Sequence, residues 1–275
     1  MVEIILVAAM LSAALLYSAK DVLSKKPIDS FGATVASFYT MVFCCLPLAA
    51  YLLATGFPSF SANDFYLAAI VGAGLSIGNL LFYKGIDAGL VSLTGFIGSL
   101  WVVFTVIAAF FFFGETLSAM QMAGVALGFA GIFVMSWKGK VGKEGVLYAF
   151  LAAAVWGLTW FNVKPLVQSV GFVSALFLYT LFAAIVGLAT VAVKKQKVLP
   201  EKSLVLPGVL LCAAYLADLW VVSVSTLSFA SALFAPSYFL MLFVFTYTVL
   251  GERLEKIHFF GTALVLVSIT LISIG

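Results

Sequence analysis

Ten long apolar runs follow one another along the chain and occupy most of its length. They lie near residues 3–24, 32–54, 65–87, 90–113, 117–137, 145–166, 172–193, 204–226, 229–250 and 256–274. A run of about 18 or more apolar residues predicts a membrane-spanning helix, because residues rise ~1.5 Å each and the hydrocarbon layer is ~30 Å thick. We therefore expect an all-α membrane protein with ten transmembrane helices joined by short connections.

The composition agrees with this class. Of the 275 residues, 64% are hydrophobic and 9% are charged, against roughly 45–50% and roughly 25% in ordinary soluble domains. We do not expect the first run to be a cleavable signal, because no basic residue precedes it and Lys20, Lys25 and Lys26 follow it. We expect a multi-pass protein of the cell membrane.

One short polar motif occurs twice, as FGETLSAMQMAG (113–124) and LGERLEKIHFFG (250–261). The segments that follow, GVALGFAGIFVMS (124–136) and GTALVLVSITLIS (261–273), also match at several positions. These matches predict two five-helix copies, residues 1–137 and 145–275, joined by residues 138–144. Five crossings in each copy force the second to enter the bilayer inverted, a common arrangement in secondary transporters with a site between the repeats.

The two Gly-Glu pairs in these motifs are interpreted as helix ends. Acidic side chains near the first turn of the fifth and tenth helices would accept from exposed amides and favour the positive end of the helix dipole. A gating ion pair through Arg253 is the alternative. His258, the single histidine, is placed by the same pattern at a helix boundary and at the membrane interface.

These features resemble the drug/metabolite transporter superfamily, and within it the EamA-type ten-helix transporters. The resemblance covers the whole chain and is carried by Gly114-Glu115, Gly251-Glu252, the glycine-rich fifth helix of each copy, AAAVWGLTW (152–160) and ALFAPSYFLMLFVFTYTVLGE (232–252). It implies transport of a small molecule through a central cavity lined by the first, third, fourth, sixth, eighth and ninth helices. Two features depart from the family pattern, namely Gly98 where the second copy has Ala235-Pro236, and the distribution of basic loops.

Asp218 is the clearest ionisable residue inside an apolar run. It lies near the middle of residues 204–226, with Tyr215 one turn earlier on the same helix face. An intramembrane charge costs at least about 2.5–3.5 kcal/mol and usually faces a cavity or a partner. Asp218 is thus a candidate for substrate binding and for coupling to protons or cations; the alternative is a packing carboxyl that hydrogen-bonds to a neighbouring helix.

Other candidate substrate-binding residues are an amide and a set of aromatic side chains on the cavity helices. Asn79 either contacts a polar substrate or ties two helices together. The aromatic candidates either line the cavity or belong to interfacial belts, and they are Tyr17, Tyr83, Trp101, Trp156, Trp160, Tyr215 and Tyr238. Lys20-Asp21 and Lys84-Asp87 are placed near helix ends, where long side chains reach toward water.

Little in the sequence indicates catalysis. We find no Asp-rich metal motif and no His-Cys ligand cluster, and Cys44, Cys45 and Cys212 read as small core residues. We therefore expect no enzyme activity, no metal, no cofactor and no nucleic-acid partner. The expected function is alternating-access transport of a small organic metabolite, such as an amino acid or an amine, by a monomer in the lipid bilayer. Lipid-headgroup flipping and a non-transporting scaffold or receptor subunit are the alternatives.

Basic residues are distributed very unevenly between the two sets of connections. Thirteen lie after odd-numbered helices, and Lys164 alone follows an even-numbered one. Because basic loops stay in the cytoplasm, this bias predicts that both termini lie outside the cell. Members of the related family usually have both termini in the cytoplasm.

The orientation can be tested by chemical labelling. An impermeant amine reagent added to sealed right-side-out cells is expected to leave Lys194, Lys195 and Lys197 unmodified, because they follow the seventh helix on the cytoplasmic side. Mass spectrometry of the labelled protein measures this, and modification of these lysines from outside would restore the usual family orientation.

Overall fold

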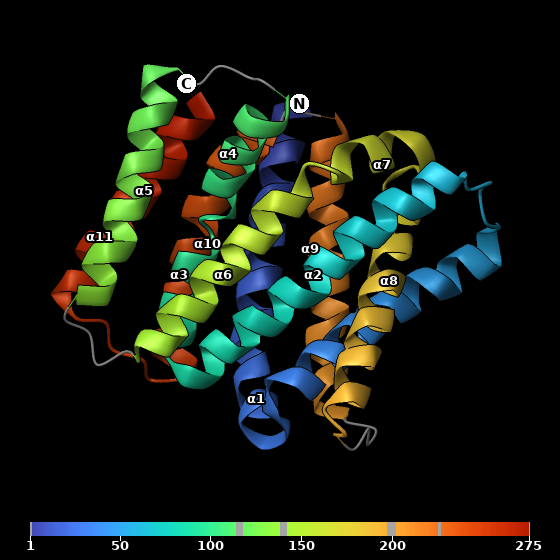
Figure 1. The fold of residues 1–275 in the computed structure, drawn as a ribbon, viewed down its shortest axis with the longest axis horizontal. Helices are drawn as coiled ribbons and strands as arrows, with labels where there is room; N and C mark the ends of the chain where they lie inside the picture. The colour runs from blue at the N-terminus through green and yellow to red at the C-terminus, as the bar shows by residue number, and fades with distance from the viewer. Residues whose placement is uncertain (1, 114–117, 138–141, 197–201, 225–226, 275) are drawn as a thin grey trace.

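The computed structural model describes residues 2–113, 118–137, 142–196, 202–224 and 227–274. Its elements are α1 (Val2–Thr55), α2 (Ala62–Ala88), α3 (Val91–Gly98), α4 (Trp101–Phe113), α5 (Ala119–Trp137), α6 (Lys143–Trp160), α7 (Val163–Val170), α8 (Phe172–Val193), the 3-10 turn η1 (Lys202–Leu204), α9 (Val205–Val224), α10 (Leu227–Val249) and α11 (Lys256–Ile274). Because α1 contains the first two apolar runs, α3 with α4 forms the fourth, and α6 with α7 forms the sixth, the expected ten-helix, all-α fold is confirmed (Figure 1).

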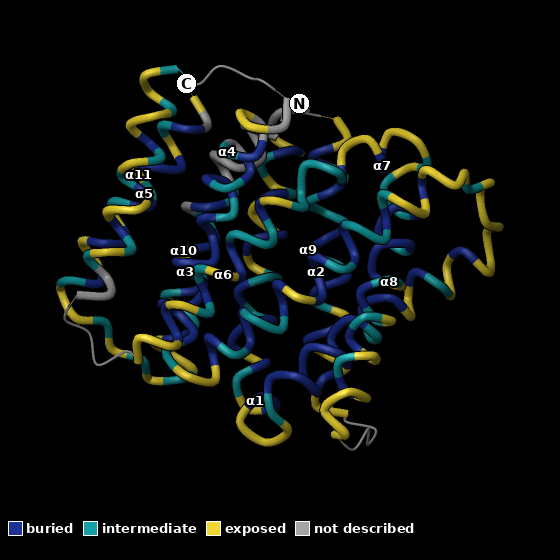
Figure 2. Tube along the Cα trace, in the orientation of Figure 1, coloured by how far each residue is buried: buried dark blue, intermediate teal, exposed yellow. Residues whose placement is uncertain are grey.

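The outer surface of the bundle is apolar. Side chains such as Ile4, Leu53 and Phe111 are 73%, 75% and 75% exposed, and exposed positions run along the outer helices (Figure 2). Among the described helices, four are long and apolar enough to span a bilayer individually, and a fifth span results when the bent pair α6–α7 counts as one. An exterior of this kind is stable when lipid covers it.

The two copies run in opposite directions. In Figure 1 the first part of α1 descends, the chain alternates direction through α2 and α3–α4, and α5 descends again. The second copy begins with α6 ascending and ends with α11 ascending, so both chain ends lie at the same face. Five crossings per copy therefore invert the second copy, as the repeat in the sequence predicts.

Equivalent glycines make equivalent contacts in the two copies. A Cβ on Gly72 of α2 would lie 2.5 Å from the carbonyl oxygen of Tyr179 in α8. A Cβ on Gly208 of α9 would lie 2.4 Å from Cβ of Phe43 in α1. Each contact joins one copy to the other, and the glycines let the helix backbones approach closely. The copies are thus packed against each other by related surfaces.

The connection between the first two runs differs from the expectation of a loop. Residues 25–31 continue the helix, and the break comes at Gly32, whose φ of 82° is readily adopted by glycine. Lys25 contributes to this turn by pairing with Asp29 at 2.9 Å and by donating to the carbonyl oxygen of Ile86 at 3.0 Å. Backbone hydrogen bonding inside the turn keeps its polar groups satisfied close to the membrane.

Two membrane helices are interrupted within the bundle. The fourth run stops at Gly98 and resumes at Trp101, and Ser99 donates its backbone N–H to the carbonyl oxygen of Gly95. The sixth run bends by 44° between Trp160 and Val163. Interrupted backbone is tolerated in a membrane where protein surrounds it or where it lines a cavity.

The second Gly-Glu pair has a different partner from the expected one. Glu252 accepts hydrogen bonds from the backbone N–H of Val91 at 2.7 Å and of Ser92 at 3.0 Å, and from the Ser92 hydroxyl at 2.6 Å. It therefore caps α3 of the first copy instead of α11, which follows it in the sequence. Arg253 is exposed and forms no ion pair in the described part of the chain, and Gly114-Glu115 lies outside it.

Other side chains cap the helices that follow the two motifs. Ser118 and Gln121 form a reciprocal capping box at the start of α5, with bonds of 3.0 and 3.1 Å. At the start of α11, the backbone N–H of Glu255 donates to Nδ1 of His258 at 3.2 Å. His258 is 2% exposed and lies in the first turn of α11, so its expected place at a helix boundary is confirmed, and it serves there as a buried capping residue.

The inter-repeat cap can be tested by mutation. We expect Glu252→Ala to lower the thermal midpoint of the detergent-solubilised protein by several degrees, because it leaves the α3 amides without an acceptor and loss of a helix cap costs about 0.5–2 kcal/mol. Glu252→Gln retains one carbonyl oxygen and should be less destabilising.

Glu255→Ala is the matched control for this measurement. Glu255 is exposed and only its backbone takes part in the described helix cap, so its removal should leave the midpoint nearly unchanged. Equal destabilisation by the two alanine variants would show that the Glu252 cap contributes nothing specific.

Candidate functional site

A cavity of about 100 Å³ lies between the two copies near the middle of the bundle. The first copy contributes α1, α2, α3 and α4 to its walls, and the second contributes α6, α9 and α10. These correspond to the six helix positions that the family resemblance implies. Eight of the nine candidate binding residues line the cavity, and they are Tyr17, Asn79, Trp101, Trp156, Trp160, Tyr215, Asp218 and Tyr238.

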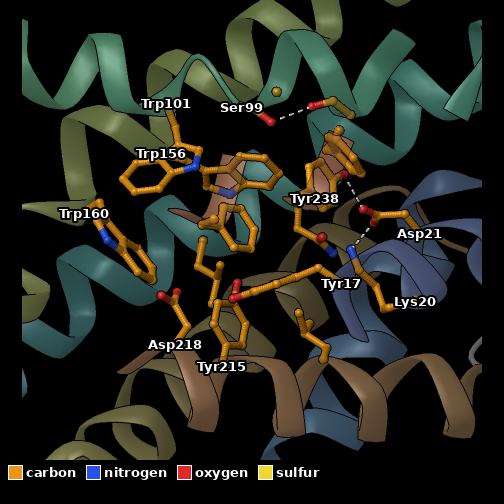
Figure 3. A pocket seen from close by; sticks show the side chains of 17 residues that line it. Tyr17, Lys20, Asp21, Ser99, Trp101, Trp156, Trp160, Tyr215, Asp218 and Tyr238 are labelled. Atoms are coloured by element: carbon orange, nitrogen blue, oxygen red, sulfur yellow. Dashed lines mark hydrogen bonds and ion pairs between the residues drawn. The ribbon is translucent and has the colours of Figure 1, made fainter. Parts of the chain in front are cut away.

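Asp218 occupies one end of this cavity. Figure 3 shows its carboxylate beside Trp160 and Tyr215, whose rings stack at a centroid distance of 6.4 Å with an interplanar angle of 27°. Asp218 is half-buried and makes no hydrogen bond or ion pair with the described residues. An unpaired carboxylate among aromatic faces is suited to a proton or to an organic cation.

Lys20 and Asp21 occupy the opposite end (Figure 3). Their placement near a helix end with side chains reaching toward water is wrong, because they are 4% and 2% exposed and pair with each other. Since α1 continues to residue 31 before its break, both residues lie inside the bundle. Lys20 therefore no longer counts as a residue of a connection. Twelve of the thirteen basic residues still follow odd-numbered helices, so the charge bias that predicts the orientation persists.

Tyr238 connects this ion pair to the second copy. Its hydroxyl donates to Oδ2 of Asp21 at 2.6 Å, and its backbone carbonyl accepts from the Ser18 hydroxyl at 3.2 Å. Glycine at position 95 makes room for the ring, since a Cβ there would lie 2.7 Å from the Tyr238 hydroxyl. Helices α1, α3 and α10 therefore meet at one polar point.

Aromatic side chains form most of the wall between the two ends. The ring of Tyr17 contacts Tyr215 and Phe234 edge-on, both at 5.4 Å. Trp101 and Trp160 approach to 5.7 Å. The Trp156 ring lies 5.3 Å from Phe82, and its buried Nε1 has no hydrogen-bond partner among the described residues. These rings line the cavity, and the edge of the Trp156 ring that carries Nε1 packs against α2, because a Cβ on Gly78 would lie 2.3 Å from that nitrogen.

The two remaining polar candidates differ in their roles. Asn79 lines the cavity and also donates Nδ2 to the Ser37 hydroxyl at 3.1 Å, which ties α2 to α1. Tyr83 does not line the cavity; it is fully buried, and its hydroxyl bonds to Ser24 at 3.0 Å and Thr40 at 3.1 Å. Tyr83 thus lies behind the cavity wall, where its ring packs beside Phe82.

Gly98 and Ser99 line the cavity where α3 ends. A Cβ on Gly98 would lie 3.0 Å from the Phe82 ring, so glycine permits close packing where the second copy has Ala235-Pro236. The side chain of Pro236 lies outside the described residues. Within the described chain, no group of three or more His, Cys, Asp and Glu side chains is arranged to hold a metal ion.

Comparison with known proteins gives an independent view of the fold. The EamA-like transporter family model matches residues 4–137 and 143–274. A solved structure described only as a crystal structure of a protein superposes with a TM-score of 0.62 at 17% identity, covering 97% of this chain and 95% of the other. At that identity the likeness shows a shared fold alone. No curated protein matches the sequence.

The two family matches coincide with the two inverted copies seen in the structure and leave only a few residues of the chain uncovered. The chain belongs to the EamA-like transporter family and is a multi-pass membrane transporter of small molecules.

Proposed function

We propose that the protein is a secondary active transporter that moves a small organic metabolite, such as an amino acid or an amine, by alternating access. The observation that carries this proposal is the location of the cavity between two inverted copies, with walls from both. Inverted repeats provide two states of similar energy, open to opposite sides, around one site. A scaffold or receptor subunit has no need of this symmetry.

The contacts around the cavity support relative movement of the copies. The main helix contacts pair α1 with α9, α5 with α11 and α2 with α6, so they join one copy to the other. Rocking one copy against the other changes such contacts without unfolding either. The interruptions at Ser99 and near Phe161 supply positions where helices can bend.

Asp218 is the residue that we assign to substrate binding or ion coupling. Its carboxylate faces the cavity without a described partner, so a bound proton or cation would remove the cost of an uncompensated charge. The adjacent faces of Trp160 and Tyr215 can contribute ~0.5–2 kcal/mol per cation–π contact to binding an organic cation. A residue that packs two helices together would have a partner on the neighbouring helix.

The role of Asp218 can be tested by transport assays. A thermal-shift screen of amino acids and organic amines on purified protein first identifies a stabilising substrate. We then expect Asp218→Asn to reduce transport of that substrate in proteoliposomes at least about tenfold and to change its pH profile, because the amide removes one of the two described carboxyls of the cavity.

Asp87→Asn provides the control, since Asp87 is exposed at the end of α2 and does not line the cavity. It should transport like the wild type. Wild-type rates and an unchanged pH profile in Asp218→Asn would remove this residue from the mechanism. Lipid scrambling in the same vesicles, without metabolite transport, would favour a flippase.

A further inference from the structure

The ion pair formed by Lys20 and Asp21 has no role in the transport proposal above. Both side chains are buried and line the cavity at the end opposite Asp218 (Figure 3). A buried ion pair usually adds little stability over apolar packing, because removing two charges from water offsets their attraction. Its position on a cavity wall instead suggests contact with a bound molecule.

The hydrogen bonding of Lys20 is incomplete. An ammonium group has three N–H donors, but Asp21 is the single described acceptor that Lys20 contacts. The rings of Phe82 and Tyr83 lie beside it, with centroids at 5.3 and 5.5 Å from Nζ. The ammonium therefore has donors available to an acceptor that enters the cavity.

Asp21 is held from its other side. Oδ2 accepts from the Tyr238 hydroxyl at 2.6 Å, whereas Oδ1 faces Lys20 and has no other described partner. If the ammonium takes a new anionic partner, Oδ1 becomes the free position of this carboxylate. The Tyr238 bond to Oδ2 can remain in place during that change.

We propose that Lys20 is the binding group for an anionic part of the transported molecule, and that Asp21 takes up one proton when this anion binds. This inference rests on the proposed transport function and adds the substrate class, an organic anion or a molecule with an anionic group. Charge balance requires the proton. The empty site holds one positive and one negative charge, an added anion leaves one negative charge uncompensated, and a proton from water on Oδ1 of Asp21 restores neutrality.

Other titratable groups lie next to the pair or elsewhere on the cavity wall. They are Tyr83 on α2, Cys44 on the second part of α1, Tyr215 and Asp218 on α9, and Tyr238 on α10. Asp218 is the other described carboxyl of the cavity, and the experiment must therefore separate it from Asp21.

Binding of small aromatic probes to the purified full-length protein tests the proposal. Benzoate is compared with benzamide, which has the same shape and no charge. In the wild type, benzoate should bind more tightly than benzamide, and its dissociation constant should fall as pH decreases, approaching about tenfold per unit when one proton is taken up.

The variants give opposite expectations for the two residues. Asp21→Asn imitates the protonated carboxyl and releases Lys20, so benzoate affinity near pH 8 should rise about tenfold and lose its pH dependence. Lys20→Met should abolish the preference for benzoate over benzamide. The double variant Lys20→Met with Asp21→Asn removes both charges of the pair together and should also show no preference, even if either single variant is unstable.

Asp218→Asn separates the two carboxyls. The pH dependence of benzoate binding should persist in this variant, because the proton resides on Asp21. The proposal is overturned if benzoate binds no better than benzamide to the wild type, if Asp21→Asn weakens benzoate binding, or if the pH dependence disappears in Asp218→Asn and persists in Asp21→Asn. All of these outcomes are measured as binding affinities. Failure of the anion-site proposal can therefore be distinguished from failure of the transport proposal, which is tested by the transport assay.

Discussion

Backbone hydrogen bonding in a hydrocarbon solvent is the constraint on which the rest of this structure depends. Lipid supplies no partner for an N–H or C=O group, so each crossing has to be helical wherever it faces lipid. Even the turn between the two parts of α1 remains helical up to Gly32. The exceptions, at Ser99 and between Trp160 and Val163, lie beside the cavity, where other helices surround the backbone.

The cavity forms where the two inverted copies pack against each other. Close packing through Gly72 and Gly208 uses equivalent surfaces of the two copies, and Glu252 of the second copy caps α3 of the first. The cavity is the space that these contacts leave open. Its wall combines aromatic rings with carboxylates at both ends, since Asp218 faces one end and Asp21 the other.

The sequence was sufficient to predict the ten helices, their division into two inverted copies and most of the aromatic wall. These features can be predicted because the length of an apolar run and the spacing of its residues depend only on nearby sequence. It was not sufficient to predict the capping of α3 by Glu252, because the two partners are 160 residues apart. Lys20 and Asp21 were misplaced for a related reason. Their charges resemble the end of an apolar run, and the helical turn that buries them depends on contacts with α2, such as the bond from Lys25 to Ile86.

The central claim is that one cavity serves both sides of the membrane. A variant without the three native cysteines, carrying Trp156→Cys, tests it in sealed vesicles of known orientation. An impermeant thiol reagent should label this cysteine from either side. Leu158→Cys, which faces lipid, should remain unlabelled from both. Labelling of Trp156→Cys from one side alone, with or without the transported substrate, would contradict alternating access through this cavity.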